Sequence, residues 1–121
     1  MGKKILIIDD DRSICSLLSH LLDNKGYDTA VSHSATDGLK KIKSELPHLV
    51  ILDVMLPDLL GWDVLKTMRQ GDTTKDIPVL MCTEKNLMDD VEKAMESGAQ
   101  GYITKPFEID RVIEKISRTI G

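Results

Sequence analysis

Short apolar segments alternate along the chain with longer segments whose apolar residues recur every three or four positions. The short segments cover residues 5–8, 27–32, 49–52, 78–82 and 101–104. Because they are too short for ordinary helices and are bounded by acids, Gly or Pro, we expect them to be β-strands. Segment 49–52 is apolar without alternation, which is typical of a strand buried on both faces of a sheet.

Five further segments show the apolar spacing of amphipathic helices. The first extends from an N-cap at Asp11 to a stop at Gly26, and the others begin near Ala35, near Gly61, after an N-cap at Asn86, and before Ile109. Pro47 is expected to end the second, and Gly98 the fourth. Their predicted inward stripes are Ile14, Leu17, Leu18, Leu21 and Leu22; Leu39, Ile42 and Leu46; Val64, Leu65 and Met68; Leu87, Val91, Ala94 and Met95; and Ile109, Val112, Ile113, Ile116 and Ile120.

Strict alternation of five strands and five helices predicts an α/β fold. Helical crossovers between successive strands are right-handed and give a parallel sheet with helices on both faces. We therefore expect residues 1–121 to form a single domain with a doubly wound, five-stranded parallel sheet in the flavodoxin-like order 2-1-3-4-5. A chain of 121 residues is long enough for one core, and we expect no effector domain within it.

Composition and charge narrow the possible partners. The chain is 41% hydrophobic and 30% charged, a balance typical of globular proteins, and no apolar run approaches the length of a membrane span. A net charge of -4 argues against direct binding to nucleic acid. Cys15 and Cys82 lack a metal-ligand spacing, so we expect two core residues in a reducing cytoplasm. The histidines at positions 20, 33 and 48 are not clustered, and we expect them on the solvated surface.

Polar residues follow or end four of the predicted strands. Asp9 and Asp10 follow the first strand, Asp53 the third, Thr83 the fourth and Lys105 the fifth. In the order 2-1-3-4-5 the acids face one crevice at the carboxyl ends of the strands. Two unit charges about 4 Å apart repel by roughly 4 kcal/mol at an effective dielectric near 20, so three carboxylates need a cation or a proton. Oxygen ligands without His or Cys favour Mg²⁺, with Mn²⁺ or Ca²⁺ as alternatives.

This combination of groups matches the requirements of phosphoryl transfer. A metal ion and Lys105 would neutralise phosphoryl oxygens, the Thr83 hydroxyl would hold another, and a carboxylate would attack in line. Asp53 is the predicted nucleophile because it lies on the central strand between the other groups.

The same residues resemble the receiver domain of two-component response regulators, and the resemblance covers the chain essentially end to end. It rests on the acidic pair after the first strand, on Asp53 followed by Pro57 and Gly61, on Thr83, and on the final Lys105-Pro106 motif, which Tyr102 precedes. Each motif is weak alone, but the four together in this order and spacing are highly specific. One departure is Leu59-Leu60, where many family members carry a methionine and an acid.

The resemblance implies a phosphorylation-dependent signalling switch and not an enzyme acting on a separate substrate. Asp53 would accept a phosphoryl group from the phosphohistidine of a sensor kinase or phosphotransfer protein. Mg²⁺ would be held by Asp10, Asp53 and the backbone carbonyl of Met55, and Asp9 would act through a metal-bound water. The Lys105–Pro106 peptide bond would be cis.

The resemblance also implies how the signal leaves the domain. Thr83 and Tyr102 would move together and reshape the face formed by the fourth helix, fifth strand and fifth helix. That face would contact a downstream protein partner or a second copy of the chain.

Two alternative functions remain open at the level of sequence. Asp9-Asp10-Asp11-Arg12-Ser13 nearly fits the Asp-x-Asp-x-Thr signature of haloacid-dehalogenase-like phosphatases. The second alternative is a pseudo-receiver that keeps the fold as an interaction module without phosphorylation. Asp11 itself is expected to be a helix cap and not a metal ligand.

Overall fold

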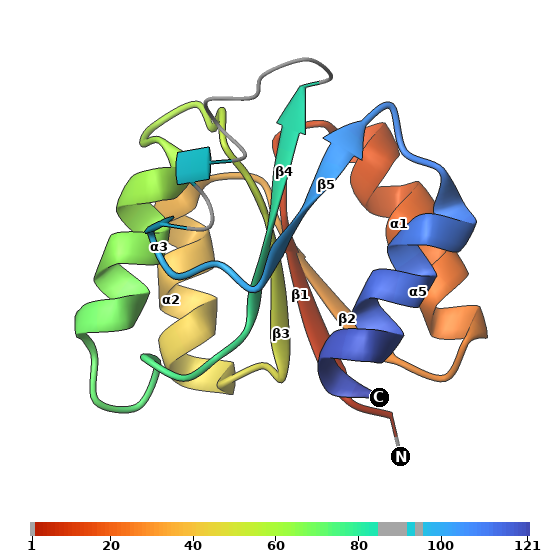
Figure 1. Cartoon of the computed structure of the whole chain (residues 1–121), viewed down its shortest axis with the longest axis horizontal. Coiled ribbons are helices and arrows are strands. Elements are labelled where there is room, and N and C mark those ends of the chain that lie inside the picture. The colour runs from red at the N-terminus through yellow and green to blue at the C-terminus, as the bar shows by residue number, and fades with distance from the viewer. Residues whose placement is uncertain (1, 85–91, 94–95) are drawn as a thin grey trace.

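The computed structural model describes residues 2–84, 92–93 and 96–121. Within this part, the five strands form one parallel sheet in the order β2-β1-β3-β4-β5, which confirms the predicted topology (Figure 1). The strands are β1 (Lys4–Ile8), β2 (Asp28–Ser32), β3 (Leu49–Asp53), β4 (Val79–Glu84) and β5 (Gly101–Lys105). Every strand therefore ends at the same edge of the sheet.

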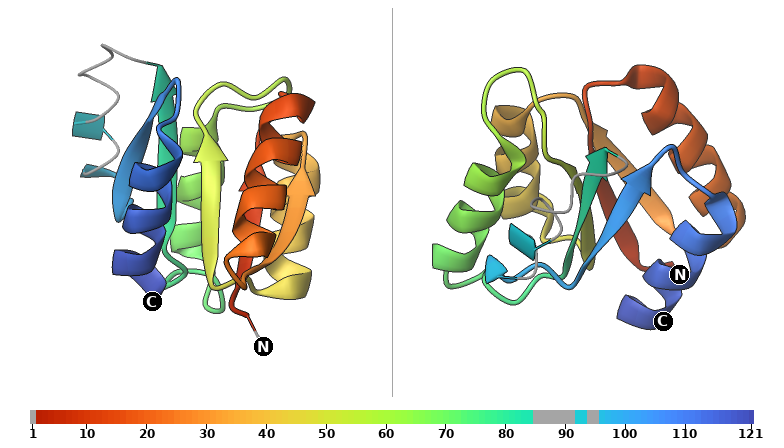
Figure 2. Two further views of the ribbon diagram at one scale, coloured as in Figure 1. Left: turned by 90° about the vertical axis from the view of Figure 1, so that its right-hand side faces the viewer. Right: turned by 45° about the horizontal axis from the view of Figure 1, so that its top comes forward.

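Helices cover both faces of the sheet. The described helices are α1 (Arg12–Asn24), α2 (Ala35–Glu45), α3 (Gly61–Gln70) and α5 (Ile109–Ile120). Helices α1 and α5 lie on one face and α2 and α3 on the other, as both Figure 1 and Figure 2 show. The stripe predicted for the helix after Asn86 lies outside the described residues, although residues 92–93 and 96 are helical.

The core has two layers because successive strand residues point to opposite faces of the sheet. Ile5 and Ile7 of β1 pack beneath α1 and α5 with Ile51, whereas Leu6 and Ile8 pack beneath α2 and α3. The four residues of the apolar run 49–52 are buried, as predicted, and Asp53 at the end of β3 is buried as well. Both cysteines are buried core residues, which confirms the expectation for them.

Two leucines in the predicted stripes are exposed. In α1 the buried face is centred on Cys15, Leu18 and Leu22, and Leu17 lies beside that face with 55% of its surface exposed. Leu46 is 47% exposed and lies outside α2, with a left-handed φ of 46°. The following Pro47 disfavours helical geometry at Leu46, so the helix ends one residue before the predicted stripe does.

No helix in the described ranges is both long enough and apolar enough to cross a membrane.

Candidate functional site

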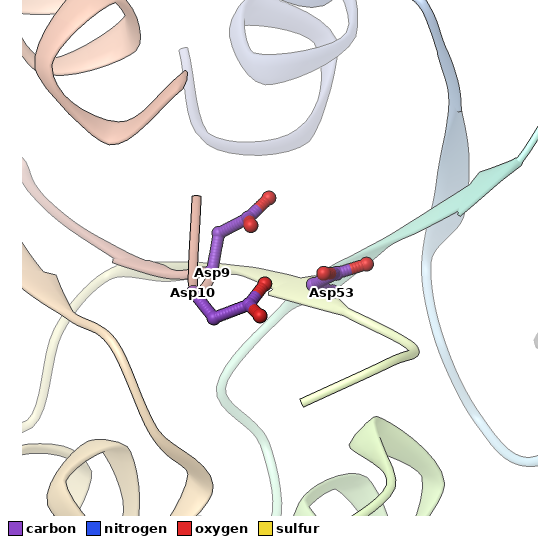
Figure 3. Close-up of side chains that lie close together, drawn as sticks. All are labelled: Asp9, Asp10 and Asp53. Atoms are coloured by element: carbon purple, nitrogen blue, oxygen red, sulfur yellow. The ribbon is translucent and has the colours of Figure 1, made fainter. Parts of the chain in front are cut away.

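Three aspartates meet at the carboxyl edge of the sheet. Asp9 and Asp10 directly follow β1, and Asp53 is the last residue of the neighbouring strand β3. Figure 3 shows their side chains gathered where these two strands end. One carboxylate oxygen of each residue lies within 4.8 Å of the others. Asp9 is 3% exposed and Asp53 is 7% exposed, whereas Asp10 faces solvent.

Lys105, the last residue of β5, supplies a positive charge to this cluster. Its Nζ lies 2.9 Å from Oδ2 of Asp9 and 3.3 Å from Oδ2 of Asp53. The other oxygen of Asp9 accepts a hydrogen bond of 2.9 Å from the backbone N–H of Asp11. Asp9 is therefore held at both oxygens, and one ammonium group is shared between the two buried carboxylates.

The electrostatics of the cluster favour an additional cation. Burial, together with the nearby Asp9 carboxylate, raises the pKa of Asp53 to about 6, and Lys105 opposes this shift only in part. Burial alone would lower the pKa of Lys105, but its hydrogen bond to Asp9 and the charge of Asp53 raise that pKa above the usual range. Lys105 brings one positive charge to two buried carboxylates. A divalent cation would supply the further positive charge that is needed to balance them.

The donor set fits a hard divalent cation. Asp9, Asp10 and Asp53 offer only carboxylate oxygens, which are the ligands that Mg²⁺ prefers. Met55 lies two residues beyond Asp53, in the loop 54–60, where it forms an isolated β-bridge with Leu60. The Met55 thioether is a soft ligand that Mg²⁺ does not favour, so a contribution from this residue to a metal site would come from its backbone carbonyl.

Three further residues singled out from the sequence are Thr83, Pro106 and Asp11. Thr83 lies in β4 opposite Thr104 of β5, and its side chain is outside the described part of the chain. The Lys105–Pro106 peptide bond is cis. Asp11 is the N-cap of α1 and accepts hydrogen bonds from the N–H groups of Ser13 and Ile14, which confirms that it is a cap.

Tyr102 lies on β5 at a distance from the acids. Its ring is half-buried, and Nζ of Lys115 lies 4.4 Å from the ring centroid and donates a hydrogen bond to the Tyr102 carbonyl. Tyr102, Phe107 and Lys115 line a groove of about 500 Å³ between β5 and α5. The aromatic ring therefore borders an open groove on the face that the resemblance associates with signal output.

Sequence reasoning missed one neighbour of the acids. His33 is half-buried, contrary to the expectation of a solvated surface position, and its Nδ1 lies 3.1 Å from the backbone carbonyl of Asp9. The signal was present in the predicted strand order, because His33 follows β2 and β2 pairs with β1. Any residue just beyond β2 must lie close to the residue just beyond β1.

Comparison with known proteins assigns the family. A family model described as the response regulator receiver domain matches residues 5–117. The chain belongs to the response regulator receiver family. The receiver domain is 41% identical to the alkaline phosphatase synthesis transcriptional regulatory protein PhoP of Bacillus subtilis, over 98% of the chain and 50% of PhoP. It is 37% identical to the DNA-binding response regulator MtrA of Mycobacterium tuberculosis, over 96% of the chain and 50% of MtrA.

Solved structures agree with this assignment. The receiver domain superposes on the chemotaxis response regulator CheY4 of Vibrio cholerae with a TM-score of 0.92 and 27% identity, covering 98% of this chain and 99% of CheY4. A CheY-like response regulator receiver domain protein from Methanospirillum hungatei gives a TM-score of 0.91 at 29% identity, covering 99% and 94%. The chain spans about half the length of the curated relatives it matches. The comparisons support neither the phosphatase nor the pseudo-receiver alternative.

Proposed function

We propose that this receiver domain accepts a phosphoryl group on Asp53 from the phosphohistidine of a sensor kinase or phosphotransfer protein, with Mg²⁺ as the required cation. The observation that carries the proposal is the position of Asp53. It ends the central strand within 4.8 Å of two further carboxylates and 3.3 Å from an ammonium group. A buried acid with a raised pKa and a specific charge partner is a typical functional residue.

The chain's own residues can perform the transfer. An oxygen of the ionised Asp53 attacks phosphorus, the bond from phosphorus to the donor's imidazole nitrogen breaks, and the imidazole leaves with the electron pair. Lys105, already beside Asp53, can neutralise a phosphoryl oxygen. Thr83 at the adjacent strand end is the proposed hydroxyl donor. Asp53, Thr83 and Lys105 are thus the proposed reactive set.

Mg²⁺ would be held by Asp10, Asp53 and the Met55 carbonyl, with Asp9 acting through a bound water. When bound, the ion would neutralise phosphoryl charge that Lys105 alone cannot balance. Both carboxylate oxygens of Asp9 already accept hydrogen bonds, one from Lys105 and one from the N–H of Asp11. Asp10 is exposed and therefore accessible to a metal ion arriving from solvent.

Tyr102 would transmit the effect of phosphorylation to the surface that contacts a partner. Thr83 and Tyr102 would shift together on phosphorylation, and the face that includes β5 and α5 would change its shape for a downstream protein partner or a second copy of the chain. Support comes from the groove beside Tyr102 and from the Lys115 contacts that hold the ring in its present position. A two-state population shift needs only a local charge change that favours one arrangement. A cytoplasmic location and the absence of direct nucleic-acid binding by this domain stay predictions.

The proposal is tested by phosphorylation with a small-molecule donor. The protein is incubated with acetyl phosphate, with Mg²⁺ or with a chelator, and its intact mass is measured. We expect one phosphoryl adduct in wild type only with Mg²⁺, and none in Asp53→Asn. Asp63→Asn, an exposed acid in the first turn of α3, is the matched control and should be phosphorylated normally. An adduct that survives Asp53→Asn, or no adduct in wild type, contradicts the proposal.

A further inference from the structure

The loop that follows the acid site is hydrogen-bonded to helix α2 through the side chain of Asp58. Asp58 lies in the loop 54–60, and both of its carboxylate oxygens accept hydrogen bonds from the start of α2. Oδ1 accepts from the N–H of Ala35 at 2.8 Å, and Oδ2 accepts from the N–H of Thr36 at 2.9 Å and from its hydroxyl at 2.6 Å. We refer to these three hydrogen bonds as the Asp58 clasp.

The clasp completes the N-terminus of α2. Ser34 is the N-cap, and its side chain accepts only from the N–H of Asp37. The N–H groups of Ala35 and Thr36 have no acceptor within their own helix, because the first turn of a helix leaves its donors unpaired. Asp58 supplies the missing acceptors from a distant loop, and its negative charge is favourable at the positive end of the helix dipole.

The two ends of the loop are held together beside Asp53. The N–H of Gly61 donates to the carbonyl of Val54 at 2.7 Å, and Met55 pairs with Leu60 in an isolated bridge. A Cβ atom at position 61 would lie 2.2 Å from the carbonyl oxygen of Asp53, so glycine is required for this close approach. The loop is therefore narrow and closed, with its base beside the acid site and its tip at Asp58.

Met55 lies between these two attachments. The base fixes the loop at residues 54 and 61, and Leu56 packs against the core, whereas Met55 and Asp58 are exposed. The Asp58 clasp fixes the tip against α2, which follows β2, the strand paired with β1. The acids Asp9 and Asp10 follow β1 directly. The loop that carries Met55 and the segment that carries two acids are thus connected through α2 by the clasp.

We propose that Asp58 is a positioning residue for the metal site: its clasp on α2 holds the loop 54–60 so that the Met55 carbonyl is placed for the cation beside Asp10 and Asp53. The inference rests on the proposed function, because it assigns Met55 to the metal site. Asp58 touches neither the acids nor a substrate, so it is not a catalytic residue. It pre-organises a ligand, and that reduces the ordering needed when the ion binds.

The charge state of Asp58 is consistent with this role. The hydrogen bond from the Thr36 hydroxyl, followed by those from the N–H groups of Thr36 and Ala35, keeps the pKa of Asp58 far below its usual range. The carboxylate is therefore ionised throughout the neutral range, and both of its oxygens stay available as acceptors. The clasp is not expected to open on modest acidification.

The test distinguishes two effects of the Asp58 side chain, which are attachment of the loop to α2 and capping of the N-terminus of α2. Asp58→Ala removes both, whereas Ser34→Ala removes a cap from the same helix and leaves the loop attached. Mg²⁺ affinity is measured for each variant by isothermal titration calorimetry, and thermal unfolding is measured in chelator. We expect Asp58→Ala to weaken Mg²⁺ binding by about threefold to tenfold, less than the roughly 10–100-fold loss typical of residues that hydrogen-bond directly to a metal ligand, because Asp58 acts through the loop.

Ser34→Ala is expected to lower the melting temperature but to leave Mg²⁺ affinity within about twofold of wild type, because capping alone affects helix stability. Thr36→Val, which removes one of the three donors, should weaken Mg²⁺ binding less than Asp58→Ala. Asp58→Asn keeps the side-chain size and replaces Asp58→Ala if that variant folds incompletely. It should also weaken Mg²⁺ binding, because one acceptor oxygen is replaced by an amide donor.

Equal Mg²⁺ affinity in Asp58→Ala, Asp58→Asn and Ser34→Ala would overturn the positioning role while leaving the proposed function intact. Failure of the wild-type protein to bind Mg²⁺ would instead overturn the proposed function. The two failures are therefore distinguishable within one set of titrations.

Discussion

The ammonium group of Lys105 lies 3.3 Å from a carboxylate oxygen of Asp53, and this pair sets the electrostatic state of the site. Lys105 also contacts Asp9 at 2.9 Å, so its one positive charge faces two buried acids. Burial, followed by the charge of Asp9, raises the pKa of Asp53 to about 6 despite the neighbouring lysine. The domain therefore holds an excess of negative charge at the point where we propose that cation binding and phosphorylation occur.

Asp53→Asn is expected to stabilise the protein in a pH-dependent way when a chelator is present. The pKa of Asp53 rises from 3.8 to about 6 on folding, which corresponds to roughly 3 kcal/mol. The native state binds the extra proton between these pH values, so wild-type stability falls as pH rises through about 6. Asparagine cannot ionise, so the advantage of Asp53→Asn should grow from near zero at pH 4 to its full value above pH 7.

Urea unfolding at several pH values in chelator measures this difference, and added Mg²⁺ should reduce it by binding only the wild-type protein tightly. A stability difference that is independent of pH would show that the pKa of Asp53 is not raised by folding.

Lys105→Met is expected to destabilise the protein most at alkaline pH. Methionine keeps much of the side-chain length but leaves Asp9 and Asp53 without their shared cation. Removing one partner from a buried ion pair costs about 3 kcal/mol or more, and partial exposure of Lys105 reduces this to roughly 2 kcal/mol at pH 8. The loss should be smaller at pH 5, where Asp53 takes up a proton.

The measurement is urea unfolding in chelator at both pH values. Lys40→Met, on the exposed face of α2, is the control and should change stability by less than about 0.5 kcal/mol. Equal losses for Lys105→Met at pH 5 and pH 8 would show that the lysine stabilises by packing and not by its charge.

Arg69, near the end of α3, hydrogen-bonds to two loops: the one that follows α3 and the one that precedes β5. Its guanidinium group donates to the carbonyl oxygens of Gly98, Lys75 and Ile77 and to Oε1 of Gln100. Arg69→Met should lower the free energy of unfolding by roughly 2 kcal/mol, because several of these acceptors lose a charged donor. Chemical denaturation measures the effect, and the neighbouring exposed Lys66→Met should be nearly silent. A loss no larger than that of Lys66→Met would contradict the assigned role of Arg69.

The layout of the sheet and the acid cluster could be predicted from sequence because each depends on local pattern. Apolar runs identified the strands, helical spacing identified the crossovers, and the carboxyl ends of parallel strands must share one edge. Asp9, Asp10, Asp53 and Lys105 converge for that reason. Boundaries were less predictable. Leu46 fits the stripe of α2 by spacing, yet it lies outside the helix, because the following Pro47 disfavours helical geometry at this position.

Contacts between loops could not be predicted in the same way. The Asp58 clasp joins residues more than twenty positions apart. Nothing in the sequence around Asp58 or Thr36 distinguishes either of them from an ordinary surface residue. The hydrogen bonds of Arg69 likewise depend on how two loops approach the end of α3. Such contacts follow from the assembled fold and not from the periodicity of any one segment.

The most direct test of the central claim is to locate the phosphoryl group chemically. Wild-type protein is phosphorylated with acetyl phosphate and Mg²⁺, reduced with borohydride, which converts an aspartyl phosphate to homoserine, and then mapped by peptide mass spectrometry. We expect homoserine at position 53 alone, only when both donor and Mg²⁺ are present. Homoserine at Asp9 or Asp10, or no homoserine in a protein that has gained the phosphoryl mass, would contradict the assignment of Asp53 as the acceptor.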